Sequence, residues 1–221
     1  MMTNLFSNFD PSTSFYLSMN WLSILIPFLI LTPSYWTIFS NLNILPQIIK
    51  TSIFKEYKIL SKNHSSNIYF FSSMILFLMI LNFMGLIPFI FTPTSHMSLS
   101  LSLSLPIWLS ILIFNISMNT NKLFSHLVPK STPFLLMPLM VLIETTSNII
   151  RPLTLAIRIS ANMIAGHLLM TLIGSQFMNC SIFMFVPIFI PQILLTILEM
   201  SVSLIQAYVF TTLSILYSNE I

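Results

Sequence analysis

Long hydrophobic runs dominate the chain, and its few charged residues lie mostly in short breaks between those runs. A membrane helix needs about 20 apolar residues, and five runs are long enough to provide them. The pattern predicts an all-α polytopic membrane protein, organised as a single membrane domain over residues 1–221. The predicted spans are 15–39, 68–91, 98–118, 133–174 and 183–216.

A basic segment at about 43–61 separates the first two predicted spans. Its apolar residues recur largely at helical spacing, which favours an amphipathic helix lying at the membrane interface. A basic loop fits the segment equally well. In either case the positive-inside rule predicts that the lysines mark the cytoplasm-equivalent side, together with Lys122 and Lys130. The segment carries Lys50, Lys55, Lys58 and Lys62 with one acid, Glu56.

The stretch "MSLSLSLSLP" alternates strictly, and alternation is typical of a strand. A membrane β-barrel needs many such segments of about ten residues, but the neighbouring runs are continuously apolar. We therefore predict a serine-rich helix whose hydroxyls bond back to their own backbone.

The last two predicted spans are longer than an upright crossing requires. About 40 helical residues reach about 60 Å, which is twice the ~30 Å hydrocarbon core of a bilayer. Each segment must therefore tilt steeply or break into two pieces. These lengths favour a tilted helical pair at the C-terminal end.

Composition supports the membrane assignment. Of 221 residues, 56% are hydrophobic and 6% are charged, and the mean hydropathy is +0.92. A soluble domain carries about a quarter charged residues, so most of this chain must face lipid. The formal charge of +3 is too sparse for nucleic acid binding, and the single Cys180 excludes an internal disulfide. No basic leader precedes Lys50, so we expect insertion without a cleaved targeting signal.

No cofactor or metal site is expected. The chain has only 3 glycines and no glycine-rich phosphate loop. Haem ligation would need facing histidines at one membrane depth, but three of the four histidines fall in predicted connections, where we expect them to be solvated. These three are His64, His96 and His126.

Polar residues form one stripe on each of the last two segments. Glu144, Arg151 and Arg158 are seven residues apart, so at about 100° per residue they share one helix face. On the final segment, five polar residues follow spacings of 4, 3, 4 and 3. They are Gln192, Thr196, Glu199, Ser203 and Gln206.

A charged side chain at the membrane centre costs about 2.5–3.5 kcal/mol, so such groups face partners or water. One reading is ion pairing between helices, for instance Glu199 with an arginine; the other is an ion or proton path. Arginine stays protonated and serves only as a fixed charge, whereas carboxylates and imidazole exchange protons. We therefore take an arginine, Arg151 or Arg158, as a candidate gate and Glu144, Glu199 and His167 as candidate proton-handling or hydrating groups.

Three stretches resemble a known family. "LAIRISANMIAGHLLMTLIG" is similar to the signature of the F-type ATP synthase subunit a family in its mitochondrial form. "LLTILEMSVSLIQAYVFTTLSILY" is similar to that family's last helix, and "LIETTSNIIRPLTLAIR" extends the first match upstream. The resemblance implies a proton-translocating stator subunit of the Fo sector in the mitochondrial inner membrane, and not an enzyme by itself.

The family resemblance also implies residue roles and partners. Arg158 matches the arginine that faces the rotor carboxylates of the c-ring. Asn162, His167, Glu199 and Gln206 match one half-channel, and Glu144 matches a polar position on the matrix side. The implied partners are the c-ring, other stator subunits including the peripheral stalk, and lipid.

Two other functions compete with the proton-translocating stator. A self-contained secondary transporter would commonly show internal repeats and helices broken at the midplane, and the sequence shows no repeat between its halves. A structural subunit of a respiratory complex would use its buried charges only for assembly.

Overall fold

The computed structural model describes residues 5–14, 17–31, 41–61, 65–118, 120, 128, 133–177 and 182–219. Within these ranges the chain forms six α-helices and no strand. The α-helices are α1 (Ile26–Ile30), α2 (Asn41–Leu60), α3 (Ser65–Leu86), α4 (Met97–Met118), α6 (Met137–Phe177) and α7 (Ile182–Asn219). Short 3-10 turns are η1 (Leu5–Phe9), η2 (Met19–Leu25), η3 (Pro93–Ser95) and η4 (Phe134–Leu136).

In the part of the chain that the structure describes, four helices are long and apolar enough to cross a membrane, and they confirm the predicted all-α polytopic class. They are Ile68–Leu86, Met97–Phe114, Met137–Phe177 and Phe185–Ser218. In the region of the first predicted span, the described residues form a shorter apolar helix, Met19–Ile30. Other parts of that expected span lie outside the described residues, as do Lys122, Lys130, His64, His126 and Cys180.

The serine-rich stretch is helical, as predicted, and begins α4. The hydroxyls of Ser100 and Ser102 donate to the carbonyls of Met97 and Leu99, at 3.1 and 2.8 Å. This back-bonding satisfies the hydroxyls inside an apolar segment. The alternation of serine and leucine therefore does not produce a strand.

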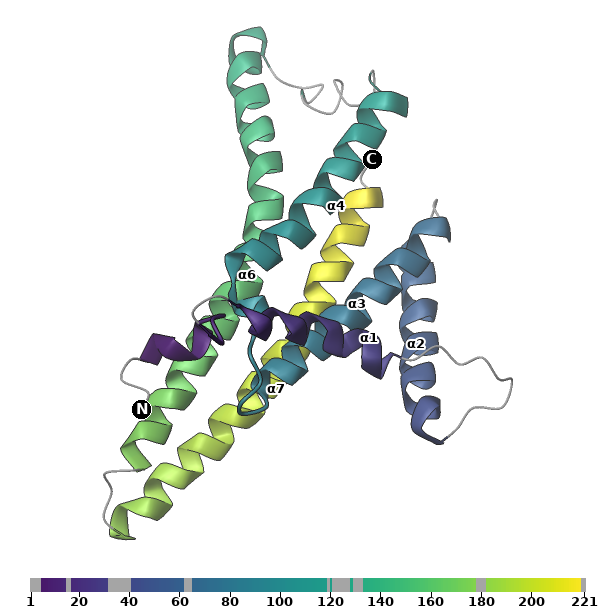
Figure 1. Cartoon of the computed structure of the whole chain (residues 1–221). Coiled ribbons are helices and arrows are strands. Elements are labelled where there is room, and N and C mark those ends of the chain that lie inside the picture. The colour runs from purple at the N-terminus through teal and green to yellow at the C-terminus, as the bar shows by residue number, and fades with distance from the viewer. Residues whose placement is uncertain are drawn as a thin grey trace.

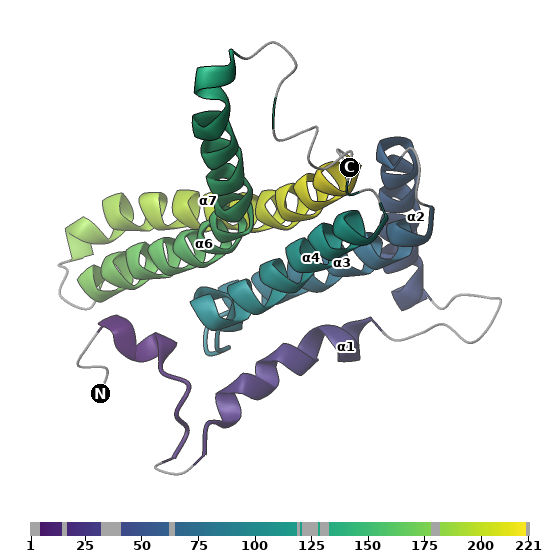
Figure 2. The same ribbon diagram turned by 90° about the horizontal axis from the view of Figure 1, so that it is seen from above.

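The helix α6 runs for 41 residues without interruption, yet it changes direction sharply part-way along (Figures 1 and 2). Pro152 lies inside this helix. A proline removes one backbone hydrogen bond and clashes with the preceding turn, which is a common cause of a kink. The segment lengths favour one tilted helix over two pieces, and the segment is indeed one continuous helix, which also has a bend.

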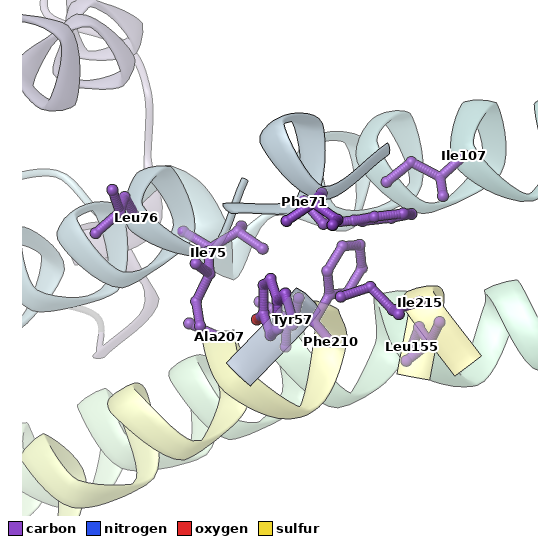
Figure 3. Close-up of a cluster of buried hydrophobic side chains, with 12 residues drawn as sticks. Tyr57, Phe71, Ile75, Leu76, Ile107, Leu155, Ala207, Phe210 and Ile215 are labelled. Atoms are coloured by element: carbon purple, nitrogen blue, oxygen red, sulfur yellow. The ribbon is translucent and has the colours of Figure 1, made fainter. Parts of the chain in front are cut away.

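The second part of α6 lies beside α7, and α3 and α4 pack against this pair (Figure 2). Apolar side chains from α2, α3, α4, α6 and α7 meet in one core cluster (Figure 3). Its members include Tyr57, Phe71, Ile107, Leu155, Phe210 and Ile215.

The segment that the sequence left open between helix and loop is the helix α2, and its buried Tyr57 attaches it to α7. Thr211 already donates its hydroxyl proton to backbone carbonyls of α7, so the Tyr57 hydroxyl is the donor to Thr211. Burial raises the pKa of Tyr57 to about 12, and the phenol therefore keeps the proton that it donates. This contact holds α2 against α7 one turn beyond the polar stripe.

Candidate functional site

The polar stripe of α7 faces the interior of the bundle. Glu199 and Ser203 are 8% and 2% exposed, whereas Ile197 and Ile205 on the opposite side are 63% and 55% exposed. A helix in lipid places its apolar residues outward, and its polar residues face other helices or water. The spacing of the stripe therefore defines the side of α7 that packs against α3 and α6.

A small cavity of about 20 Å³ lies where α3, α6 and α7 meet, which is room for about one water molecule. Each of the three helices contributes at least one polar residue to its wall. The polar lining residues are Asn82, Asn162, Glu199, Ser203 and Gln206. The structure thus brings together Asn162, Glu199 and Gln206, three of the six site residues that the family resemblance implied.

Hydrogen-bond acceptors are in excess around this cavity. Both carboxylate oxygens of Glu199, Oε1 of Gln206 and Oδ1 of Asn82 are buried without a partner among the described residues. The Asn82 amide donates to the Ser203 carbonyl at 3.4 Å. Buried acceptors nearly always find a donor, so this site requires water or protons to satisfy it. The alternative in which Glu199 pairs with an arginine does not occur within the described residues.

Gly166 makes room for the Glu199 carboxylate. A Cβ added at Gly166 would overlap the carboxylate and would lie 2.8 Å from its Cδ. The crowded atoms are the end of a flexible side chain, so the carboxylate can move aside without disturbing the helices. Gly166 therefore determines where the carboxylate lies rather than whether α6 and α7 pack.

We predict that Gly166→Ala lowers proton flux severalfold. The free energy of unfolding should change by no more than about 1 kcal/mol, because the higher helix propensity of alanine, worth about that amount, offsets the crowding of the carboxylate. The matched control is Gly174→Ala on the same helix, because nothing lies within 4 Å of its added Cβ. Proton flux and thermal unfolding of the assembled complex are the measurements. Equal flux in the two variants would remove Gly166 from this role.

Asn82 belongs to the site, and our reading of the sequence missed it. It is 1% exposed, and it is the only polar side chain in the run "MILFLMILNFMGLI". An isolated amide inside an apolar span was the available signal, because such a group is costly in lipid unless it faces a partner. Its α3 position could not be related to α6 and α7 without the fold.

His167 lies outside the cavity, on a neighbouring face of α6. Its ring is close to the backbone of Gly85 and meets Phe9 edge-on, with ring centroids 6.2 Å apart. Its Nε2 atom is buried without a hydrogen-bond partner among the described residues. The adjacent Gly166 lines the cavity together with Glu199, so His167 and Glu199 lie near the same turn of α6 on different sides.

Arg158 is half-buried and has no ion pair or hydrogen bond among the described residues. One turn away on the same face, Asn162 reaches the edge of the cavity. Small exposed residues, Thr154, Ala161 and Ala165, surround this face of α6. The guanidinium therefore projects from a surface that a neighbouring helix can approach closely.

The other charged residues of α6 lie nearer its beginning. The Arg151 guanidinium lies over the ring of Tyr217, 5.0 Å from its centroid, in a cation–π contact with α7. Glu144 is half-exposed and precedes the bend. Neither residue lines the cavity around Glu199.

The expectation that His96 is solvated was wrong. Its ring is half-buried and forms a three-ring cluster with Trp21 and Phe91, whose centroids are 5.2 and 5.3 Å away, and its Nε2 atom is buried. The connection between α3 and α4 folds inward against α6, so position in a predicted loop does not indicate exposure here.

Comparison with known proteins identifies the family. The family model described as ATP synthase A chain matches residues 37–219. The chain belongs to the ATP synthase A chain family. Proteins described as ATP synthase subunit a are 48% identical in Drosophila yakuba over 223 residues, 50% in Locusta migratoria over 228 and 48% in Aedes aegypti over 225. In all three cases the alignment covers 100% of both chains.

Membership of the ATP synthase A chain family confirms the resemblance drawn from the three C-terminal motifs. The chain is thus a subunit of the ATP synthase complex and not an enzyme by itself, and it takes part in proton transport and ATP synthesis. Its apolar helices agree with a multi-pass membrane subunit.

Proposed function

We propose that the chain is the stator of the Fo sector, forming two offset half-channels against a rotating c-ring, with Arg158 as the gate. The observation that carries this proposal is a permanent cation with no counter-ion among the residues that the structure describes, on an exposed face of small residues. A buried cation requires a partner. An ionisable carboxylate on an adjacent rotor subunit would supply it.

The gate follows from the chemistry of arginine. A rotor carboxylate crosses lipid only when it is neutral, and it ionises beside a compensating positive charge. Because a guanidinium does not release its proton, Arg158 stabilises the ionised carboxylate but passes no proton itself. Protons must therefore be carried on the carboxyl groups of the rotating c-ring from one half-channel to the other.

The cavity around Glu199 supports an inlet half-channel. Its excess of acceptors suits a path in which water and a carboxylate exchange protons, with Asn162 and Gln206 as hydrogen-bonding groups. His167 approaches from the adjacent face of α6 and would lie on the same path. Glu144, beyond the bend, would belong to the outlet on the opposite side.

The cellular setting completes the proposal. The chain would act as a single membrane domain, residues 1–221, in the mitochondrial inner membrane. Its partners would be c-ring subunits, the peripheral stalk and other stator subunits. Each proton crossing a potential of 100 mV releases about 2.3 kcal/mol, and several crossings together can drive synthesis elsewhere in the complex.

The test compares the intact complex with the isolated chain, each reconstituted in liposomes. We expect the chain to co-purify with a ring of small hairpin subunits, and the complex to carry proton flux under an imposed potential. The isolated chain should carry none. Proton or solute transport by the isolated chain would overturn the proposal, because a self-contained transporter needs no ring.

A further inference from the structure

The helix α2 crosses one end of the bundle of long helices (Figure 2). The same end holds the beginning of α3 and the ends of α4 and α7 (Figure 1). Because α3, α4 and α7 are long enough to span a membrane, their ends lie near its surface. A helix crossing the bundle at that level lies at the membrane interface.

Two opposite faces of α2 have different chemistry. The inner face carries both aromatic residues of its second half, Phe54 and Tyr57, and packs on α3 and α7. At about 100° per residue, Ile48, Lys55 and Ile59 lie within roughly 20° of the direction opposite Tyr57. Ile48 and Ile59 are 61% and 79% exposed, and Lys55 is exposed as well.

Lys58 lies at the edge of this outer face, also exposed, while the only acid of the helix, Glu56, lies at the other edge. A face turned only to water would not require two largely exposed isoleucines. A face immersed in hydrocarbon would not carry lysines. Lysine and isoleucine together fit the boundary, where the ammonium groups reach headgroups and the apolar side chains reach acyl chains.

From this arrangement we propose that the outer face of α2, with Lys55 and Lys58 beside Ile48 and Ile59, is a docking surface for anionic phospholipid. The lysines would bind the headgroup phosphates, and the isoleucines would contact the acyl chains. The proposal depends on the membrane placement of α2 and is independent of the proton path assigned to Arg158 and Glu199.

Composition favours lipid over a protein partner on this face. Cores of protein interfaces are enriched in aromatic residues and depleted in lysine. The outer face has the opposite composition, because Phe54 and Tyr57 both belong to the inner side. An anionic lipid layer attracts clustered lysines at about 1 kcal/mol each, or about fivefold in affinity.

Lipid bound to the outer face would stabilise the position of α2 against the bundle. The inner face is already attached to α7 by the Tyr57–Thr211 hydrogen bond. Thr211 lies five residues beyond Gln206 on the helix that carries the cavity residues. An anionic lipid would therefore support the position of α7 from outside the proton path.

The test uses the whole ATP synthase complex in phosphatidylcholine vesicles with a photoreactive phospholipid carrying either a phosphatidylglycerol or a phosphatidylcholine headgroup. Adducts within residues 41–61 are counted by mass spectrometry, with unlabelled lipid as competitor. We expect phosphatidylglycerol to be preferred in the native complex. In the double variant Lys55→Gln/Lys58→Gln, the ratio of phosphatidylglycerol adducts to phosphatidylcholine adducts should fall by about 25-fold, which is fivefold for each lysine.

Two control variants make the result specific. Lys50→Gln removes one positive charge on the side of α2 near Tyr57 and should keep the preference, whereas each outer-face lysine would contribute about fivefold. Lys55→Arg/Lys58→Arg keeps the charge and should keep it too. Equal labelling by both headgroups, or an unchanged preference in the double glutamine variant, would overturn the proposal. If the double glutamine variant lost another subunit from the complex while its lipid labelling stayed unchanged, the proposal would also be overturned. The outer face would then bind an acidic protein partner.

Discussion

An Arg158→Lys subunit should assemble normally, and its coupled proton flow should fall about 100-fold. Lysine can lose its proton in a dry site, whereas arginine keeps its charge. A charge at the membrane centre is worth about 2.5–3.5 kcal/mol, and each 1.36 kcal/mol changes a rate about tenfold. Losing the compensating cation would therefore leave the rotor carboxylate without the charge that permits its ionisation.

The measurement is ATP-driven proton pumping by the purified complex in liposomes, with subunit content checked on a native gel. Arg151→Lys is the comparison variant, because a lysine can also lie over the Tyr217 ring. We expect it to retain most of the pumping. Normal pumping in Arg158→Lys would refute the gate, and equal losses in both variants would indicate a general requirement for arginine on α6.

Much of the fold could be predicted because lipid imposes a simple rule on side chains. In α7 the five polar residues recur on one face, and a membrane helix turns such a face inward. The observed burial of Glu199 and Ser203 follows that rule. The serine-rich start of α4 was also predictable, because its neighbours have no strand pattern.

The composition of the site was less predictable because it depends on contacts between helices. Asn82 reaches the cavity from α3, and its contact with Ser203 joins positions 121 residues apart. The contact of Arg151 with Tyr217 likewise joins α6 to the end of α7. Periodicity reports which face of one helix is polar, but it does not report which helix lies opposite.

The exposure of side chains in the segments that connect helices also could not be predicted from the sequence. His96 packs in a cluster with two aromatic rings because the connection between α3 and α4 folds back against α6. Pro152 marks α6 as a helix that can bend, yet proline is tolerated in membrane helices and need not change their direction. Tertiary packing decides both outcomes.

A Glu199→Gln subunit is expected to slow proton flux roughly 10- to 100-fold, below the full effect of a positioned proton-transfer group because water in the cavity can still carry protons. Glutamine preserves the shape of the side chain and removes only its capacity to exchange a proton. The carboxylate has no partner among the described residues, so no ion pair is broken. Assembly should therefore be unaffected.

Passive proton flux under an imposed potential measures this effect, with Glu56→Gln on α2 as the matched substitution outside the cavity. Glu56→Gln should leave flux unchanged. A purely space-filling role for Glu199 predicts a different pattern, because glutamine would then be harmless while Glu199→Ala would enlarge the cavity and lower thermal stability. Unaltered flux in Glu199→Gln would thus remove the carboxylate from the proton path and leave it a packing role between α6 and α7.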